Sequence, residues 1–170
     1  MIQFFYALKK PKSLEASMYK ELIAKLSLGN EWVRIQPPCP HSEIAYAEKV
    51  AGHPFPKALV DLLLEMNGDN WCLLSAQEIA QNAERNRETW LPLFEEDYTM
   101  EEYLDRVDRF IFFATNGCGD YYCYRVGADE IVDETTIYIW EHEEIGEHCC
   151  WRAVASSMTE FITRYYESEI

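Results

Sequence analysis

The residues with the most chemical potential are cysteines and a histidine in the second half of the chain. Cys118 and Cys123 are separated by four residues, Cys149 and Cys150 are adjacent, and His142 lies nearby. Zinc sites take such pairs when a tight turn presents both thiolates. Along an unbroken strand, however, Cys118 and Cys123 face opposite sides, and neighbouring Cys149 and Cys150 also diverge. We therefore expect no metal and no cofactor, and interpret the cysteines as reduced packing residues.

A glycine-rich stretch with Gly117, Gly119 and Asp120 has some features of a phosphate-binding loop. Such loops lead into a helix N-terminus, and the P-loop also supplies a lysine, whereas here a strand is predicted to follow. We therefore predict a tight turn, in which the glycines supply backbone freedom and Asp120 accepts hydrogen bonds from nearby amides. Asn67 and Gly68 are interpreted in the same way, as the end of a helix.

The acid–base residues of the sequence are concentrated around His142, which lies among Glu141, Glu143 and Glu144. Such a run is typical of a solvated face, and fully hydrated carboxylates do not suit proton transfer near pH 7. The sequence also contains no Gly-x-Ser-x-Gly elbow, no His-Glu-x-x-His motif and no P-loop. We therefore expect that the protein is not an enzyme and has no catalytic residues.

Several helices must position these residues. Apolar residues at helical spacing predict helices over residues 14–26, 43–51 and 56–66, the second of which ends at Gly52. Capping boxes, in which Ser or Thr is followed three residues later by Glu, begin at Ser75, Thr99 and Ser157. These boxes predict three further helices, over residues 76–87, 100–107 and 158–165.

Short runs of β-branched and aromatic residues predict strands over residues 71–74, 110–114, 121–126 and 136–140. Helices come first and three strands follow together, so an α+β fold is favoured over regular βαβ alternation. With 170 residues, 48% of them hydrophobic, we expect one domain over residues 1–170. Its sheet is predicted to be mixed or antiparallel, with about four to six strands backed by helices.

The charge of the chain is concentrated in two segments. The sequence has 30 acidic and 15 basic residues, a formal net charge of −15. Residues 95–105 hold six acids and residues 129–147 hold eight, and neither segment contains Lys or Arg. Such blocks are either solubilising faces or interaction surfaces. The remainder of the chain is nearly neutral, and the sequence alone leaves both interpretations of the two segments open.

The same charge argues against several partners. Binding to nucleic acid or to an anionic membrane surface requires Lys and Arg that neutralise phosphates, and this chain is repelled by both. The longest apolar run, near residues 110–114, is far shorter than the roughly 20 residues that span a bilayer. The N-terminus has its basic residues after the apolar run, the reverse of a secretory signal. We therefore expect a cytoplasmic protein with no membrane and no nucleic-acid partner.

Three landmarks occur in a fixed order along the sequence. They are a helix that ends in Asn67 and Gly68 after a proline-containing entry, a turn at residues 116–122, and a strand that leaves through Trp140 at residues 137–143. Together they resemble the SUKH superfamily, also called the SMI/KNR-like family. The likeness covers about residues 42–166, with a helical extension at residues 1–30. The family commonly has Asp after the Trp, where this chain has Glu141.

This resemblance implies an α+β fold with a sheet backed by helices, and no catalytic residues. The motif residues are expected to be structural: Asn67, Gly68, Trp71, Gly117, Gly119, Asp120 and His142. Bacterial members are mostly immunity proteins that bind and neutralise a toxin, often a nuclease or a deaminase. Because such a toxin needs a basic groove, carboxylates can occupy that groove in place of phosphates.

We therefore predict an immunity protein that blocks the substrate groove of a basic toxin. Acidic complementarity raises the association rate, and an aromatic anchor holds the complex. The residues expected to bind the toxin are Glu95, Glu96, Asp97, Glu101, Glu102, Glu141, Glu143 and Glu144, with Trp140 as the anchor. Two alternatives remain open: a regulatory adaptor that binds a host protein or peptide, as fungal members of the family suggest, and a metal-dependent enzyme.

Overall fold

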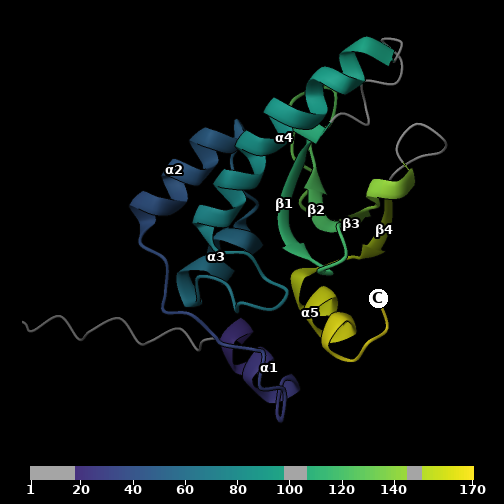
Figure 1. The fold of residues 1–170 in the computed structure, drawn as a ribbon. Coiled ribbons are helices and arrows are strands. Elements are labelled where there is room, and N and C mark those ends of the chain that lie inside the picture. Colours follow the sequence, from purple (N-terminus) through teal and green to yellow (C-terminus); the bar gives the residue numbers. More distant parts are fainter. Residues whose placement is uncertain (1–17, 98–106, 145–150) are drawn as a thin grey trace, which may run out of the picture.

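The structure, a computed structural model, describes residues 18–97, 107–144 and 151–170 (Figure 1). In these ranges the chain forms α1 (Met18–Leu26), α2 (His41–Ala51), α3 (Lys57–Glu65), α4 (Ala76–Asp97), β1 (Phe110–Thr115), β2 (Tyr121–Arg125), β3 (Ile137–Trp140), β4 (Trp151–Ala155) and α5 (Met158–Tyr166). Two short 3-10 helices, η2 (Val107–Arg109) and η3 (His142–Glu144), precede β1 and follow β3. None of the described helices is long and apolar enough to cross a membrane.

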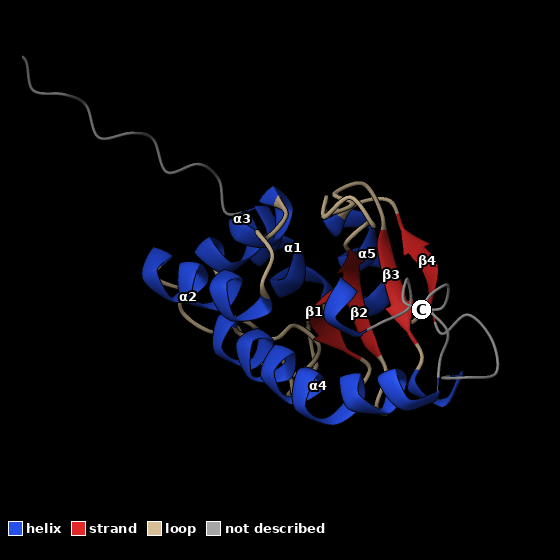
Figure 2. Ribbon diagram, turned by 90° about the horizontal axis from the view of Figure 1, so that it is seen from above, coloured by secondary structure: helices blue, strands red, loops and turns tan. Residues whose placement is uncertain are grey.

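The described strands form one antiparallel sheet in the order β1-β2-β3-β4, each strand pairing with the next along the chain. Helices α2 and α3 lie beyond β1 and β4 forms the far edge, as Figures 1 and 2 both show. Helices α1 and α5, from opposite ends of the chain, pack against each other. This arrangement confirms the predicted α+β class.

Alternation along the strands divides the apolar residues between two cores, because successive side chains of a strand face opposite sides of the sheet. Ile111 and Phe113 of β1 belong to the main core, which also contains Leu63 of α3 and Phe161 of α5. The other face carries a smaller cluster, whose buried members are Val107, Phe110, Phe112, Cys123 and Trp140. The sheet is therefore apolar on both sides.

Two of the predicted capping boxes are present and begin helices. At the start of α4, the Glu78 amide donates to Ser75 Oγ (3.2 Å), and the Ser75 amide donates to Glu78 Oε2 (2.7 Å). At the start of α5, Ser157 Oγ accepts from the Glu160 amide (3.2 Å), while Glu160 accepts from the Ser156 amide (2.8 Å). Each box satisfies N–H groups that have no partner within the helix.

Several elements differ from the sequence prediction. Helix α4 continues to Asp97, ten residues beyond its predicted end, and strand β4 was not predicted. The predicted strand at residues 71–74 is reduced to a single bridge between Leu73 and Ala114. Its chain turns instead, because the Asp69 carboxylate accepts hydrogen bonds from three successive amides there. The predicted helix over 100–107 lies almost wholly outside the described residues, and Val107 begins η2.

Asn67 and Gly68 do not cap α3, contrary to the sequence interpretation. The helix ends at Glu65, and Met66 is already extended. The Asn67 side chain accepts from the Ala76 amide (2.8 Å) and so connects this loop to the start of α4. Gly68 has φ +85°, and a Cβ there would lie 2.8 Å from the Leu73 carbonyl oxygen. Both residues thus hold the loop against the segment that leads into α4.

Helix α1 is capped by a residue from a distant part of the chain. The Glu65 carboxylate accepts from the amides of Met18 (3.1 Å), Tyr19 (2.7 Å) and Lys20 (3.0 Å), which are donors at the helix N-terminus. Tyr19 and Ile23 of α1 are buried in the main core. The helix is therefore attached both by apolar packing and by a carboxylate from the end of α3.

Replacing Glu65 with alanine is expected to destabilise the attachment of α1 by about 1–2 kcal/mol, as loss of a capping side chain does. Hydrogen exchange should become faster at the amides of Met18, Tyr19 and Lys20. The matched control is Asp61→Ala, one turn earlier on the same helix, which removes only an exposed ion pair to Lys57. Equal exchange in both variants would contradict this account of the cap.

Candidate functional site

The first acidic segment begins at the end of α4. The last turn of this helix contains Glu95, Glu96 and Asp97 and no basic residue. The C-terminus of a helix carries partial negative charge, so three acids there are unfavourable for helix stability. Glu101 and Glu102 lie outside the described residues, as do the side chains of 95–97. These three acids therefore lie at the end of α4 where negative charge does not stabilise the helix.

The second acidic segment is divided by strand β3. Four of its acids precede the strand, and two acids with described side chains follow it. The two groups lie at opposite ends of a four-residue strand, about 13 Å long at 3.3 Å per residue. Asp129, Glu130 and Glu134 are exposed before the strand, and Glu143 is exposed after it. The side chain of Glu144 lies outside the described part of the structure. The segment therefore forms two acidic patches instead of one.

Folding brings arginines to this segment from elsewhere in the chain. Arg109 of η2 lies 2.6 Å from Glu130, and Arg152 of β4 lies 3.4 Å from Glu141. Both pairs are at the surface, where ion pairs contribute little to stability, but each cancels one negative charge. A segment without bases in the sequence is thus partly neutralised in space, and Glu134 and Glu143 are the more available acids.

A third arginine packs over two aromatic rings beside the patch that precedes β3. The Arg125 guanidinium carbon lies 3.3 Å from the centroid of the Trp151 ring and 5.5 Å from that of Tyr138. The Tyr138 hydroxyl donates to Asp133 (2.7 Å), which also accepts from Thr135. Burial tends to raise the pKa of Asp133, but these hydrogen bonds outweigh it and lower the pKa below its usual value. Asp133 therefore has a structural role in this loop.

Trp140 is not available as the predicted anchor. Its side chain is only 2% exposed, and its ring meets that of Phe112 edge-on at 5.4 Å in the smaller core. A partner cannot contact it without unfolding that core, so its expected role in toxin binding is wrong. Trp71, by contrast, is 44% exposed. Alternation along β3 is what directs Trp140 inward.

The glycine-rich stretch forms the predicted turn, between β1 and β2. Asp120 accepts from the His142 amide (3.1 Å) and from the Asn116 side chain (2.9 Å), and its Oδ1 lies 2.8 Å from His142 Nδ1. Burial tends to raise the pKa of Asp120, but the hydrogen bonds from His142 and Asn116 lower it overall. The turn is thereby fixed to η3, which carries Glu143.

The two glycines of this turn differ in their surroundings, which gives a matched pair of variants. A Cβ on Gly119 would lie 2.6 Å from the His142 ring, whereas one on Gly117 meets nothing within 4 Å. Both have positive φ, so Gly117→Ala should cost about 1 kcal/mol from backbone strain alone. Gly119→Ala should cost about 1–3 kcal/mol more, because it displaces His142. Urea unfolding measures both, and equal losses would contradict the packing of His142 on Gly119.

The cysteines do not form a reactive site among the residues described. Cys118 is exposed in the turn, whereas Cys123 is buried in the smaller core, and Cys149 and Cys150 lie outside the described residues. Burial, and secondarily Glu43, raises the pKa of Cys39 to about 11, and burial also raises that of Cys72. Both thiols stay protonated at neutral pH and are poor nucleophiles. No group of three His, Cys, Asp or Glu within the described ranges is placed to hold a metal.

Sequence reasoning missed two carboxylates that each accept hydrogen bonds from three successive backbone amides, Glu65 and Asp69. Asp69 is fully buried and accepts from the amides of Trp71, Cys72 and Leu73, each at 2.9 Å. The Tyr166 hydroxyl of α5 donates to its other oxygen. In the sequence, Asp69 is a polar residue next to Asn67-Gly68 and therefore indicates only a loop. Its structural role becomes evident only from its burial.

These observations define a single α+β domain with a four-stranded antiparallel sheet in the described residues, packed against helices and bearing charged loops. Comparison with known proteins identifies the family of this domain. The model of the SMI1/KNR4 family (SUKH-1) matches residues 38–164, and the chain belongs to this family. The match agrees closely with the region of resemblance deduced from the sequence. No curated protein matches the chain.

Proposed function

We propose that this protein is a cytoplasmic immunity protein that binds a cognate toxin one-to-one and blocks its substrate groove. Membership of the SUKH-1 family supports this proposal, because its bacterial members are mostly of the immunity type. The observation that carries the choice of partner is the concentration of charge, with 14 of the 30 acids in two segments free of bases. The partner is therefore a basic domain of the nuclease or deaminase kind.

Inhibition in this proposal requires no chemistry from the immunity protein. Carboxylates at the end of α4 and around β3 take the positions that substrate phosphates occupy in the toxin groove. Complementary charge steers the encounter and raises the association rate, while apolar contacts at the centre of the interface slow dissociation. With Trp140 buried, the exposed motif residue Trp71 is an aromatic side chain that can make such contacts.

The test uses the protein encoded beside this gene. Co-expression of the two proteins should restore growth that the neighbour alone prevents, and the purified pair should form a 1:1 complex in which the neighbour's activity on nucleic acid is lost. A neighbour that forms no complex would overturn the proposal. Specific binding to a host regulatory protein, with no protection against any toxin, would support the adaptor alternative.

A further inference from the structure

A shallow trough made of two neighbouring hollows runs along α4, and none of its lining residues belongs to either acidic segment. Its first part, about 530 Å³, lies between the proline-rich segment 36–40 and the start of α4. Its second part, about 340 Å³, lies between α4 and the β1–β2 hairpin at Thr115 and Tyr121. Glu78 and Gln81 line both parts, so the two lie next to each other along α4.

Primary amides are concentrated in this trough. All three glutamines that the structure describes line it, together with three of the six described asparagines: Gln36, Asn67, Asn70, Gln77, Gln81 and Asn82. We call these six residues the amide trough. The side chains of Asn70, Gln77 and Gln81 are exposed, and no hydrogen bond joins any of them to another group in the described structure.

The chemistry of these side chains matches that of a polypeptide main chain. Each amide offers a carbonyl acceptor and an NH₂ donor, the same pair of groups that a peptide unit presents, so the two can bond reciprocally. An extended segment is the conformation in which peptide groups remain free to pair with a partner surface. A saccharide would also accept such bonds, but the one aromatic ring in the trough, Tyr121, has its hydroxyl bonded to Arg85 at 2.8 Å.

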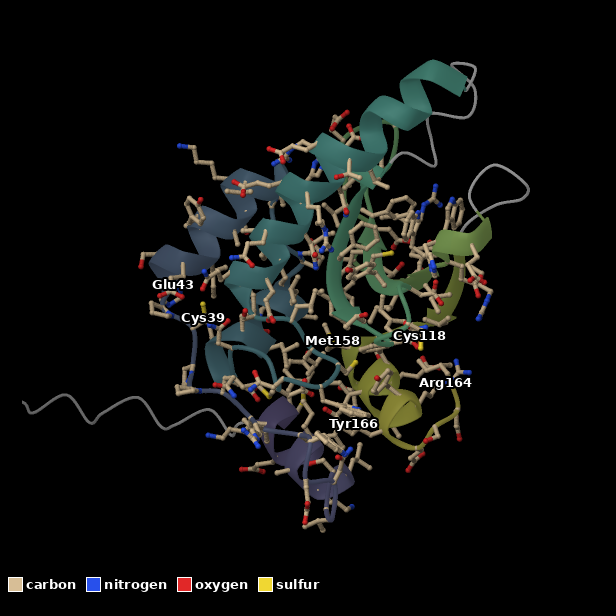
Figure 3. All side chains as sticks on the ribbon, in the orientation of Figure 1. Cys39, Glu43, Cys118, Met158, Arg164 and Tyr166 are labelled. Carbon is tan, nitrogen blue, oxygen red and sulfur yellow. The ribbon has the colours of Figure 1, made fainter. Side chains whose placement is uncertain are left out.

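The dimensions and charges of the trough define the ligand further. From Gln77 to Arg85 α4 rises about 12 Å at 1.5 Å per residue, which accommodates roughly four residues of an extended peptide. Glu43 lies at the end next to the proline-rich segment, beside Cys39 (Figure 3), and Arg85 lies at the end next to the hairpin. A peptide with a basic residue at one end and an acidic residue at the other fits this polarity.

We propose that the amide trough binds an extended segment of a partner protein, about four residues long, through its main chain. The basic end of the segment lies over Glu43 and the acidic end over Arg85. None of these residues belongs to either acidic segment, and the inference holds whether or not the protein neutralises a toxin.

A random heptapeptide library displayed on phage, selected against the full chain, tests the proposal. Enriched peptides, made synthetically, should shift the amide NMR signals of Asn70, Gln77 and Gln81. The double variant Gln77→Ala/Gln81→Ala should bind them at least tenfold more weakly. Both positions are exposed on a helix, where alanine is well tolerated, so the variant keeps the fold.

The matched control is Tyr46→Ala/Lys49→Ala, two exposed positions on α2 that do not line the trough. It should bind the selected peptides within twofold of the wild type. The proposal is wrong if no peptide is enriched, or if enriched peptides bind the trough variant as tightly as the wild type. Binding to a glycan array that the trough variant loses, with no peptide binding, would also overturn it and assign the trough to saccharides.

Discussion

Replacing Asp69 with alanine is expected to lower the free energy of unfolding by about 3 kcal/mol or more. The variant leaves the amides of Trp71, Cys72 and Leu73 without an acceptor in a buried loop, and each such unsatisfied group costs about 1–3 kcal/mol. It also removes the acceptor of the Tyr166 hydroxyl, which connects α5 to this loop. Urea unfolding followed by circular dichroism measures the loss.

Two further variants separate burial from hydrogen bonding in this prediction. Asp129→Ala removes an exposed carboxylate that accepts one amide hydrogen bond, from Ile131 (3.1 Å), and should cost no more than about 1 kcal/mol. Tyr166→Phe should cost about 1–2 kcal/mol, since burial and the charge of Asp69 raise the pKa of Tyr166 and keep its hydroxyl protonated as a donor. A loss for Asp69→Ala no greater than that for Asp129→Ala would contradict the role assigned to Asp69.

Reversing the charge of Glu95, Glu96, Glu101 and Glu102 to lysine is expected to slow association with a basic toxin by at least about tenfold at low salt. The association rate of the wild type should fall steeply as salt is added, because screening weakens electrostatic steering. The variant should show a much flatter dependence. Stopped-flow measurement from 20 mM to 500 mM salt, roughly from weak to strong screening, records both slopes.

The control for this variant must change the net charge equally at another place. Glu21, Glu31, Glu167 and Glu169 are exposed and lie outside both acidic segments, so their reversal to lysine is matched in charge and residue type. It should reduce the association rate much less. If both quadruple variants slow association equally, net charge alone is responsible and the first segment is not the toxin site.

Local signals predicted the helix starts well. The exchange of hydrogen bonds between Ser75 and Glu78 occurs within four residues, so the sequence contains everything needed to predict it. The same holds for Ser157 and Glu160, and for the turn at Gly117 and Gly119. Short-range hydrogen bonding and glycine conformation depend little on the rest of the fold, which is why these predictions are confirmed.

Features that depend on distant residues were missed or misplaced. Glu65 caps a helix 45–47 residues away, and nothing in its own neighbourhood indicates this. Strand β4 contains Arg152 and Ala153, both exposed, so its own sequence lacks a clear strand pattern, and it pairs with β3. Trp140 was expected to anchor the partner, whereas strand alternation directs its ring into the smaller core.

The sequence predicts which acidic residues belong to the candidate site, but not which of them are neutralised by arginines. The sequence identifies which residues are acidic, yet it cannot show that Arg109 and Arg152 reach Glu130 and Glu141 from other elements. The amide trough is equally invisible in the sequence, because Gln36 and Gln81 come together only after the proline-rich segment packs beside α4.

The bond between Asp69 and Tyr166 also bears on how the domain folds during its synthesis. The two residues are 97 positions apart, so the loop at Asp69 is made long before its hydroxyl partner. The domain therefore cannot finish folding until α5 has been synthesised, and a truncation that removes Tyr166 should act on the whole fold.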